Sequence, residues 1–162
     1  MTDFAALLAA LESADVEFII VGGVAATVHG SARLTQDLDI VYARADANLE
    51  RLVEALAPLD PYLRGAPPGL PFEWSVETLR RGLNFTLATS AGDLDVLGEI
   101  PGGGDYARLQ SSSIEIELFG VPCRCLDLPG LIRAKRAAGR PRDLDALAEL
   151  EALLEETERT GG

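Results

Sequence analysis

The chain has 162 residues, a length that suits one domain around one hydrophobic core. Apolar residues make up 48% of it, which is the composition of a folded protein rather than of a disordered chain. The formal net charge is −12, from 14 basic and 26 acidic side chains, and so acidic a surface repels nucleic acids and anionic membranes at long range. The charge argues against a general nucleic-acid binder, but it permits a small anionic substrate whose charge a bound metal ion offsets.

The N-terminal segment and the cysteines indicate where the protein works. Residues 1–18 are amphipathic and acidic, without the basic start of a signal peptide or the apolar run of a membrane span. Cys123 and Cys125 are two positions apart, which suits apolar fillers of a buried strand better than a zinc site. We therefore expect a cytoplasmic protein with no disulfide framework and no contact with a membrane.

Helical periodicity recurs along the chain. Thr2 is the expected N-cap of the first helix, and Gly30 and Pro58 are expected to end two others. The predicted helices cover residues 3–13, 24–29, 48–56, 129–138 and 143–156, with one or two helical turns at 76–81.

Strand patterns fill most of the rest. Residues 17–21 form a short apolar run, and residues 37–43 alternate acidic and apolar side chains. Two hairpins are expected, with strands at 83–89 and 93–100, and at 113–118 and 121–126.

Loops rich in Pro and Gly are expected at residues 60–71 and 101–104. The order of elements predicts an α+β fold in which helices flank a mixed central β-sheet. We expect a single domain over residues 1–158 and a frayed tail over residues 159–162.

Asp37 and Asp39 are the first candidate functional residues. They are two positions apart on a predicted strand, so both side chains leave the same face. Two like charges roughly 6–7 Å apart repel one another unless a cation joins them, and Mg²⁺ prefers oxygen ligands. A lone Asp-x-Asp pair is more often a solvated strand edge, so its interpretation depends on the other residues.

A second Asp-x-Asp pair, Asp93 and Asp95, lies on another predicted strand. A neighbouring antiparallel strand could bring one of these residues beside Asp37 and Asp39. Asp95 is deeper in its strand and is the expected third ligand, whereas Asp93 follows the turn and is expected to be solvated. Together the three carboxylates predict a site for Mg²⁺ or Mn²⁺, with room for the bridged pair of ions that some such sites hold.

Gly22 and Gly23 end the first apolar strand and open a short helix. Backbone N–H groups at such a junction can donate to phosphate oxygens, because no Cβ blocks the approach. A tight turn is the commoner reason for a Gly-Gly pair, so this pair supports a phosphate site only together with the carboxylates.

These residues carry a resemblance to a known family. The run VGGVAATVHGSARLTQDLDIVY resembles the signature of small nucleotidyltransferases of the DNA polymerase β-like superfamily. Its Gly-Gly, its helix ending in His-Gly and its Arg-x-Thr-x-Asp-x-Asp resemble the minimal bacterial branch, which includes nucleotidyltransferase toxins of abortive-infection and toxin–antitoxin systems. The run LIRAKRAAGRPRDLDAL resembles the same branch, in which a lysine helix precedes an Arg-Pro-x-Asp turn.

The resemblance implies the palm-like fold of that superfamily and transfer of a nucleoside monophosphate from an NTP, such as ATP, with release of pyrophosphate. Gly22 and Gly23 would hold the triphosphate, and Asp37 and Asp39 would bind the metal ions. Asp95 would complete the triad and help to activate the acceptor hydroxyl.

The resemblance also gives roles to three residues outside the triad. Lys135 would lie near the triphosphate, Arg33 would brace the site or touch phosphate, and Asp143 would orient Lys135 or the C-terminal helices. Arg33 could equally form an ion pair with Asp37 or Asp39.

Position 23 departs from the pattern of many active members, which carry serine there. Because that hydroxyl is a phosphate contact, binding of the NTP would depend more on the backbone and on Lys135. Five basic residues lie within positions 133–142, and this cluster is either a solvated helix face or an edge that binds phosphate or RNA.

Three functions follow from the sequence. The first is a Mg²⁺-dependent nucleotidyltransferase whose acceptor is tRNA, a protein or a small molecule, in a toxin–antitoxin or defence system with a toxin or antitoxin as partner. The second is a catalytically silent, antitoxin-like protein that binds a nucleotide or a partner. The third is an α+β protein whose acidic edge binds Mg²⁺ or Ca²⁺ adventitiously.

Overall fold

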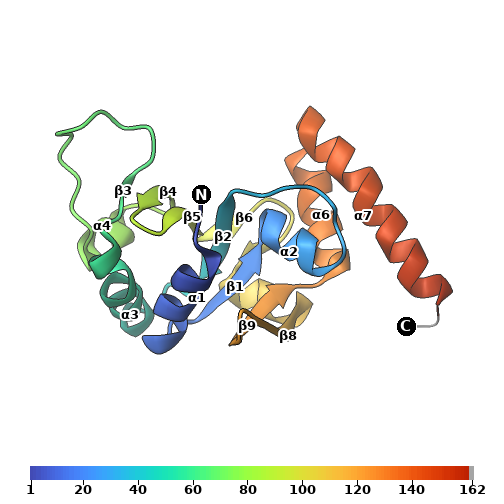
Figure 1. Cartoon of the computed structure of the whole chain (residues 1–162), viewed down its shortest axis with the longest axis horizontal. Helices are drawn as coiled ribbons and strands as arrows, with labels where there is room; N and C mark the ends of the chain where they lie inside the picture. The colour runs from blue at the N-terminus through green and yellow to red at the C-terminus, as the bar shows by residue number, and fades with distance from the viewer. Residues whose placement is uncertain (161–162) are drawn as a thin grey trace.

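The computed structural model describes residues 1–160 of the chain (Figure 1). Its helices are α1 (Phe4–Ser13), α2 (Gly22–Val28), α3 (Asp46–Leu56), α4 (Val76–Arg81), α5 (Tyr106–Leu109), α6 (Leu128–Ala138) and α7 (Pro141–Arg159), with 3₁₀ turns η1 (Ala57–Leu59) and η2 (Gln110–Ser112). Its strands are β1 (Phe18–Val21), β2 (Asp37–Tyr42), β3 (Tyr62–Leu63), β4 (Asn84–Thr89), β5 (Gly92–Leu97), β6 (Glu99–Ile100), β7 (Gly104–Asp105), β8 (Ser113–Leu118) and β9 (Val121–Leu126).

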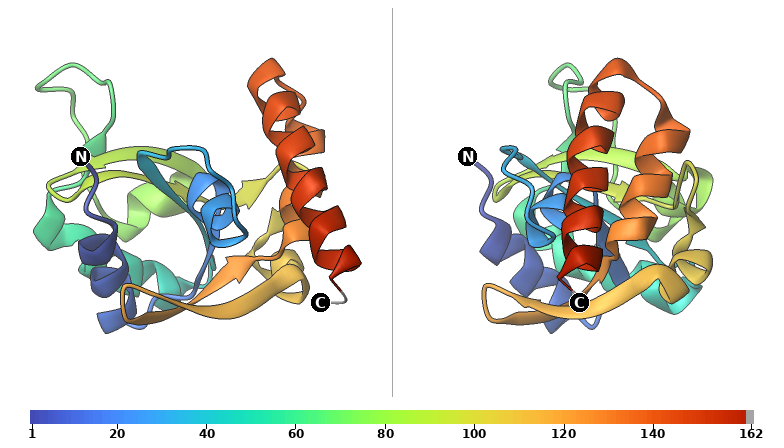
Figure 2. Two further views of the ribbon diagram at one scale, coloured as in Figure 1. Left: turned by 45° about the vertical axis from the view of Figure 1, so that its right-hand side comes forward. Right: turned by 90° about the vertical axis from the view of Figure 1, so that its right-hand side faces the viewer.

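The large sheet is mixed. Within residues 1–160 it has seven strands in the order β3-β4-β5-β2-β1-β9-β8. The pairs β2–β5 and β1–β9 are parallel, and the other pairs are antiparallel. α1 packs beside α3, and α6 and α7 lie side by side at one end of the molecule (Figure 2). The predicted α+β architecture, with helices flanking a mixed sheet, is confirmed.

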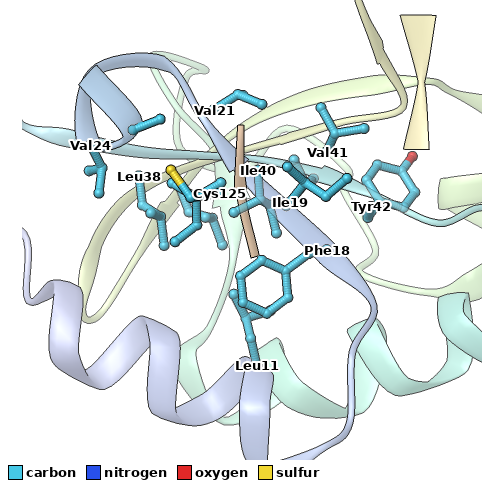
Figure 3. Packing of buried hydrophobic residues seen from close by; sticks show 14 of the residues in the cluster. Leu11, Phe18, Ile19, Val21, Val24, Leu38, Ile40, Val41, Tyr42 and Cys125 are labelled. Carbon is cyan, nitrogen blue, oxygen red and sulfur yellow. The ribbon is translucent and has the colours of Figure 1, made fainter. Parts of the chain in front are cut away.

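The core forms around the two central strands. Ile19 on β1 and Leu38 and Ile40 on β2 have no exposed surface, and Leu11 of α1 packs in the same cluster (Figure 3). Each buried aliphatic side chain of this kind contributes roughly 1.5–3 kcal/mol. Cys125 belongs to the cluster as an apolar filler, which agrees with the expectation for the two free cysteines.

The first helix begins differently from the prediction. Asp3, not Thr2, is the N-cap of α1, and its Oδ1 accepts a hydrogen bond from the Ala6 N–H at 3.0 Å. The Thr2 hydroxyl donates instead to the Gln36 carbonyl and accepts a hydrogen bond from the Asp93 N–H at 3.2 Å. Thr2 is therefore used to join the chain before β2 to the start of β5.

The direction of β5 also differs from the prediction. We expected an antiparallel partner for the Asp37–Asp39 strand, but β5 runs parallel to β2. The chain leaves β2 through α3 and α4 before it returns, and such a long crossover allows parallel pairing. The antiparallel partner of β5 is β4, across the predicted hairpin.

Several boundaries were predicted only roughly. The expected loop at 60–71 contains the short edge strand β3, and the predictions omitted β7 and α5. α2 begins at Gly22, and α7 begins at Pro141 and extends to Arg159. Residues 161–162 of the expected frayed tail lie outside the described residues. None of the helices in residues 1–160 has both the length and the apolar surface needed to cross a bilayer.

Asn48 is a polar residue inside the fold, with only 1% of its surface exposed. Its amide group accepts from the Glu17 N–H at 2.7 Å and donates to the carbonyls of Glu17 at 3.1 Å and Ala43 at 2.8 Å. This side chain joins the chain ahead of β1 to the chain that follows β2.

Replacing Asn48 is expected to destabilise the protein strongly. Asn48→Ala removes three hydrogen bonds to the backbone, among them the buried bond to the Ala43 carbonyl, so the free energy of unfolding should fall by about 2–4 kcal/mol in urea titrations. Asn84→Ala is the control, because exposed Asn84 receives a single bond from the Gly98 N–H at 2.8 Å. Equal losses in the two variants would contradict the role of Asn48.

Candidate metal centre

Four carboxylates form an array on one face of the sheet. In the parallel register of β2 and β5, Asp37 lies opposite Asp93 and Asp39 lies opposite Asp95. Side chains alternate along each strand, so these four share a face while Leu38 and Leu94 are buried on the other. The strand pairing thus creates the charge cluster that the two Asp-x-Asp patterns suggested.

Three of these carboxylates lie close enough to share a cation. Asp37, Asp39 and Asp95 each offer one oxygen, and all of these atoms lie within 4.8 Å of one another. Octahedral Mg²⁺, with bonds of about 2.1 Å, separates its ligand oxygens by roughly 3–4.2 Å, so a small closing movement completes the site. Asp39 Oδ1 is buried without a hydrogen-bond partner, and a cation would satisfy it. The three residues predicted as ligands therefore suit a divalent cation.

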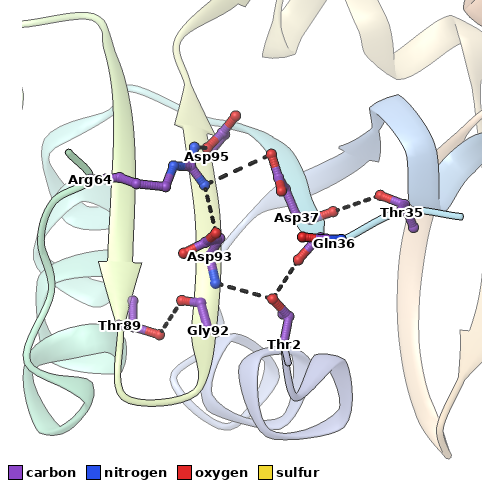
Figure 4. A network of polar contacts seen from close by, with 9 residues as sticks. All are labelled: Thr2, Thr35, Gln36, Asp37, Arg64, Thr89, Gly92, Asp93 and Asp95. Carbon is purple, nitrogen blue, oxygen red and sulfur yellow. Dashed lines mark hydrogen bonds and ion pairs between the residues drawn. The ribbon is translucent and has the colours of Figure 1, made fainter.

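Arg64 is the cation that sequence reasoning missed. It follows β3, and its guanidinium contacts Asp95 Oδ1 closely through Nη2 (Figure 4). Its Nη1 lies 3.6 Å from Asp93 Oδ2 and 3.8 Å from Asp37 Oδ2. The residue falls in the Pro- and Gly-rich segment expected to be a loop, where no pattern connects it to an aspartate 31 positions away.

Burial and mutual repulsion disfavour charge on the central carboxylates. Desolvation, and then repulsion by Asp95 and Asp37, raise the pKa of Asp39 to about 7, while nearby Lys135 acts to lower it. Burial also raises the pKa of Asp95, although the hydrogen bond from Arg64 opposes that rise. A cation at the cluster would stabilise the charged carboxylates and so oppose both pKa shifts.

Gly22 leaves space for Asp39. It has φ of +67°, and a Cβ at this position would come within 2.1 Å of Asp39 Oδ2. The absence of a side chain at Gly22 therefore lets Asp39 approach the β1–α2 junction directly. This is the position that the resemblance associates with a triphosphate.

Gly23 leaves space for a different side chain. A Cβ at position 23 would lie 2.6 Å from the Thr35 hydroxyl oxygen, which also donates to the Asp37 carbonyl at 3.2 Å. The predicted turn residue Thr35 therefore packs against the Gly-Gly junction, and the two glycines are required for separate reasons.

Lys135 and Asp143 line a cleft of about 170 Å³ together with Gly22 and Asp39, which is the member of the carboxylate cluster that borders it. Asp143 is 1% exposed and accepts from Lys135 Nζ at 3.3 Å and from Arg140 Nε at 2.6 Å. The Arg140 hydrogen bond is the main cause that lowers the pKa of Asp143 to about 2. Asp143 thus holds the Lys135 side chain at the cleft, and Lys135 remains 27% exposed there.

Arg33 does not join the aspartates. Its Nε lies 3.5 Å from Glu149 Oε1 on α7, and its side chain is 52% exposed. Glu149 also accepts from the Ser31 hydroxyl at 2.6 Å and from the Ala32 N–H at 3.2 Å. The expected ion pair with Asp37 or Asp39 is therefore wrong, because a carboxylate from α7 binds this segment instead.

The basic cluster on α6 and α7 is not a single surface. Arg133 donates to the Ser112 hydroxyl at 2.9 Å, and Arg136 pairs with Glu151 at 3.0 Å. Lys135 and Arg140 are the members that line the cleft. Only part of the cluster is therefore directed toward the carboxylates.

No protein-family model matches the chain, and no curated protein matches it either. The likeness to minimal nucleotidyltransferases therefore depends on the residues named above and on their arrangement.

Stability of the metal-free protein should depend on pH through Asp39. Its raised folded-state pKa means that its contribution is fully present below the unfolded pKa of about 4 and is lost as pH rises through about 7. In EDTA, the free energy of unfolding should fall by on the order of 1 kcal/mol or more between pH 5 and 9. Asp143 acts in the opposite sense, because its lowered pKa means that its contribution to stability is lost only as pH falls toward about 2. That contribution is therefore constant between pH 5 and 9.

Asp39→Asn removes the ionisable group and should flatten this profile, which thermal unfolding at several pH values would measure. A fall of the same size in Asp39→Asn and in the wild type would mean that other groups cause it.

Gly22→Ala tests the close approach of Asp39. The substitution adds both left-handed backbone strain and the clash with Asp39, so it should cost at least about 2 kcal/mol more than Gly120→Ala. Gly120 is a matched control, because its φ is +77° and no atom lies within 4 Å of its added Cβ. Similar urea midpoints for the two variants would argue against the clash.

Proposed function

We propose that the protein is a divalent-metal-dependent nucleotidyltransferase with the palm-like fold of the polymerase β-like superfamily. One observation carries this proposal: Asp39, whose carboxylate clusters with those of Asp37 and Asp95, lines one cleft together with Gly22 and Lys135. A structural ion-pair network would not need a buried, unpartnered carboxylate oxygen beside a side-chain-free turn.

Each residue has a chemical role in this proposal. Asp37, Asp39 and Asp95 would hold Mg²⁺ or Mn²⁺. The bound ion would neutralise the charge of the phosphates and the negative charge that develops on their oxygens during transfer. The backbone N–H groups of the Gly22–Gly23 junction donate to phosphate oxygens, and Lys135 donates to the triphosphate. The acceptor hydroxyl oxygen attacks the α-phosphorus in line and pyrophosphate leaves, while Asp95 accepts the proton of that hydroxyl.

Asp143 positions the lysine. Its buried carboxylate contacts Lys135 at 3.3 Å and Arg140 at 2.6 Å, so the lysine points into the cleft without a large loss of side-chain entropy on binding. Arg33 acts at a distance from the carboxylates by joining the segment before β2 to α7. We assign it a supporting role rather than a phosphate contact.

The shape of the cleft does not select the acceptor, which is tRNA, a protein side chain or a small molecule. The strongly acidic surface favours a protein or a small molecule, because it repels RNA everywhere except at the small basic edge formed by Lys135 and Arg140. A cytoplasmic role as a toxin, with an antitoxin as partner, is consistent with this chemistry.

A specific observation favours a second candidate, a catalytically silent nucleotide-binding or antitoxin-like regulatory protein. Glycine replaces the serine of many active relatives at position 23, and Arg64 already neutralises part of the carboxylate cluster. The cleft and its lysine would then bind a nucleotide without transferring it.

Asp39→Asn should abolish transfer while the fold stays intact. Each α-³²P-labelled NTP, incubated with Mg²⁺ and cell lysate, should label an RNA or protein band for the wild type and none for the variant. Asp46→Asn is the matched control, because Asp46 is an exposed aspartate of α3 paired with Arg80 at 3.1 Å.

Full transfer by Asp39→Asn would refute the metal assignment. Calorimetry separates the two candidates, since nucleotide binding without any label transfer would favour the silent protein. An absence of nucleotide binding in the wild type would overturn both.

A further inference from the structure

Arg64 is placed by the same strand register that places the carboxylates. Its N–H donates to the Thr86 carbonyl at 3.0 Å, which continues the β3–β4 pairing by one residue. Thr86 lies opposite Asp95 on β5, and Asp95 lies opposite Asp39 on β2. Arg64, Asp95 and Asp39 therefore lie in one row across the sheet, with the small side chain of Thr86 between them.

The guanidinium lies over one side of the carboxylate cluster only. It contacts Asp95 Oδ1, and it lies 3.6 Å from Asp93 Oδ2 and 3.8 Å from Asp37 Oδ2. Its side chain is 26% exposed, so solvent screens these contacts less than it screens pairs on the outer surface. Figure 4 shows the guanidinium between Asp37, Asp93 and Asp95, on the side toward β4.

On the other side of the cluster, Lys135 and Arg140 line the cleft next to Gly22, but within residues 1–160 neither forms an ion pair with Asp37, Asp39 or Asp95. Asp39 Oδ1 is buried and lacks a hydrogen-bond partner among the described residues, and Asp39 Oδ2 faces Gly22. Asp37 and Asp95 each have a second oxygen that Arg64 does not contact at these distances. The Asp39 carboxylate is thus available to a cation on the Gly22 side, and one oxygen of Asp37 and one of Asp95 lie within 4.8 Å of an Asp39 oxygen.

A second divalent cation has different requirements. Paired ions lie about 3.5–4 Å apart and share carboxylates that bridge them through both oxygens. Here Asp95 Oδ1 and Asp37 Oδ2 face the guanidinium, so a second ion held by these oxygens would lie next to a fixed positive charge. An arginine is charged at every accessible pH, so it does not leave this position by losing a proton.

We infer that Arg64 is a resident counter-ion that limits the three-aspartate cluster to one divalent cation, bound on the side that faces Gly22. The inference rests on the proposed function, because it requires that the cluster bind such a cation at all. Arg64 then takes the place of a second metal ion beside Asp95, and it is a positioning residue that keeps Asp95 directed toward the reacting groups.

Mn²⁺ alone is a suitable probe, because paramagnetic resonance reports the free ion during a titration of the full chain. The wild type should bind one Mn²⁺ per chain. Arg64→Met and Arg64→Gln, which remove the charge, should bind two. Arg64→Lys keeps a charge over the same oxygens and should bind one, as should the control Arg80→Met, which removes an arginine paired with Asp46 elsewhere.

Two Mn²⁺ ions in the wild type would overturn the inference without any variant, which keeps it testable if a variant does not fold. One Mn²⁺ in both Arg64→Met and Arg64→Gln, with native circular dichroism, would also overturn it while leaving the metal site intact. No Mn²⁺ in the wild type or in the Arg64 variants would instead remove the metal site on which the proposed function depends.

Discussion

Repulsion among four aspartates on adjacent strands is the constraint around which the candidate site is organised. The in-register pairing of β2 with β5 brings Asp37, Asp39, Asp93 and Asp95 onto one face, and no side chain on those strands separates them. Arg64 compensates one part of this charge, whereas burial and then repulsion by Asp95 and Asp37 raise the pKa of Asp39. The buried Leu38 and Leu94 on the opposite face prevent the strands from slipping to relieve the repulsion, because a shift of one residue would bury the acids.

The remaining features of the site keep the Asp39 carboxylate accessible to a ligand. Because Gly22 has no side chain, Asp39 can approach the β1–α2 junction. Asp143 is buried away from the cluster, where it holds Lys135 at the cleft rather than competing with the aspartates for it. Two acidic groups with opposite pKa shifts therefore lie on the two sides of one small cleft, which is typical of sites that bind or transform a charged ligand.

Local patterns predicted the residues of the cluster better than they predicted its partners. The Asp-x-Asp alternation placed both pairs on strand faces, and Asp95, preferred to Asp93 because it is deeper in its strand, has a carboxylate oxygen within 4.8 Å of oxygens of Asp37 and Asp39. The parallel direction of β5 was not accessible, because it depends on a crossover through α3 and α4 rather than on any local signal. Sequence patterns did not reveal Arg64 or Glu149 for a related reason. Each binds a partner 31 or more positions away, and an isolated charged residue in a loop or on a helix has no periodicity that indicates such a partner.

The contact between Gly23 and Thr35 has a consequence for how such a sequence can change. The Thr35 hydroxyl lies 2.6 Å from where a Cβ of residue 23 would be, so the space at this junction holds one hydroxyl-bearing side chain and not two. A side chain at position 23 therefore requires Thr35 to move or to be replaced by a smaller residue. The two positions are sterically coupled, because the same small space at the β1–α2 junction accommodates the Thr35 hydroxyl only while residue 23 is glycine.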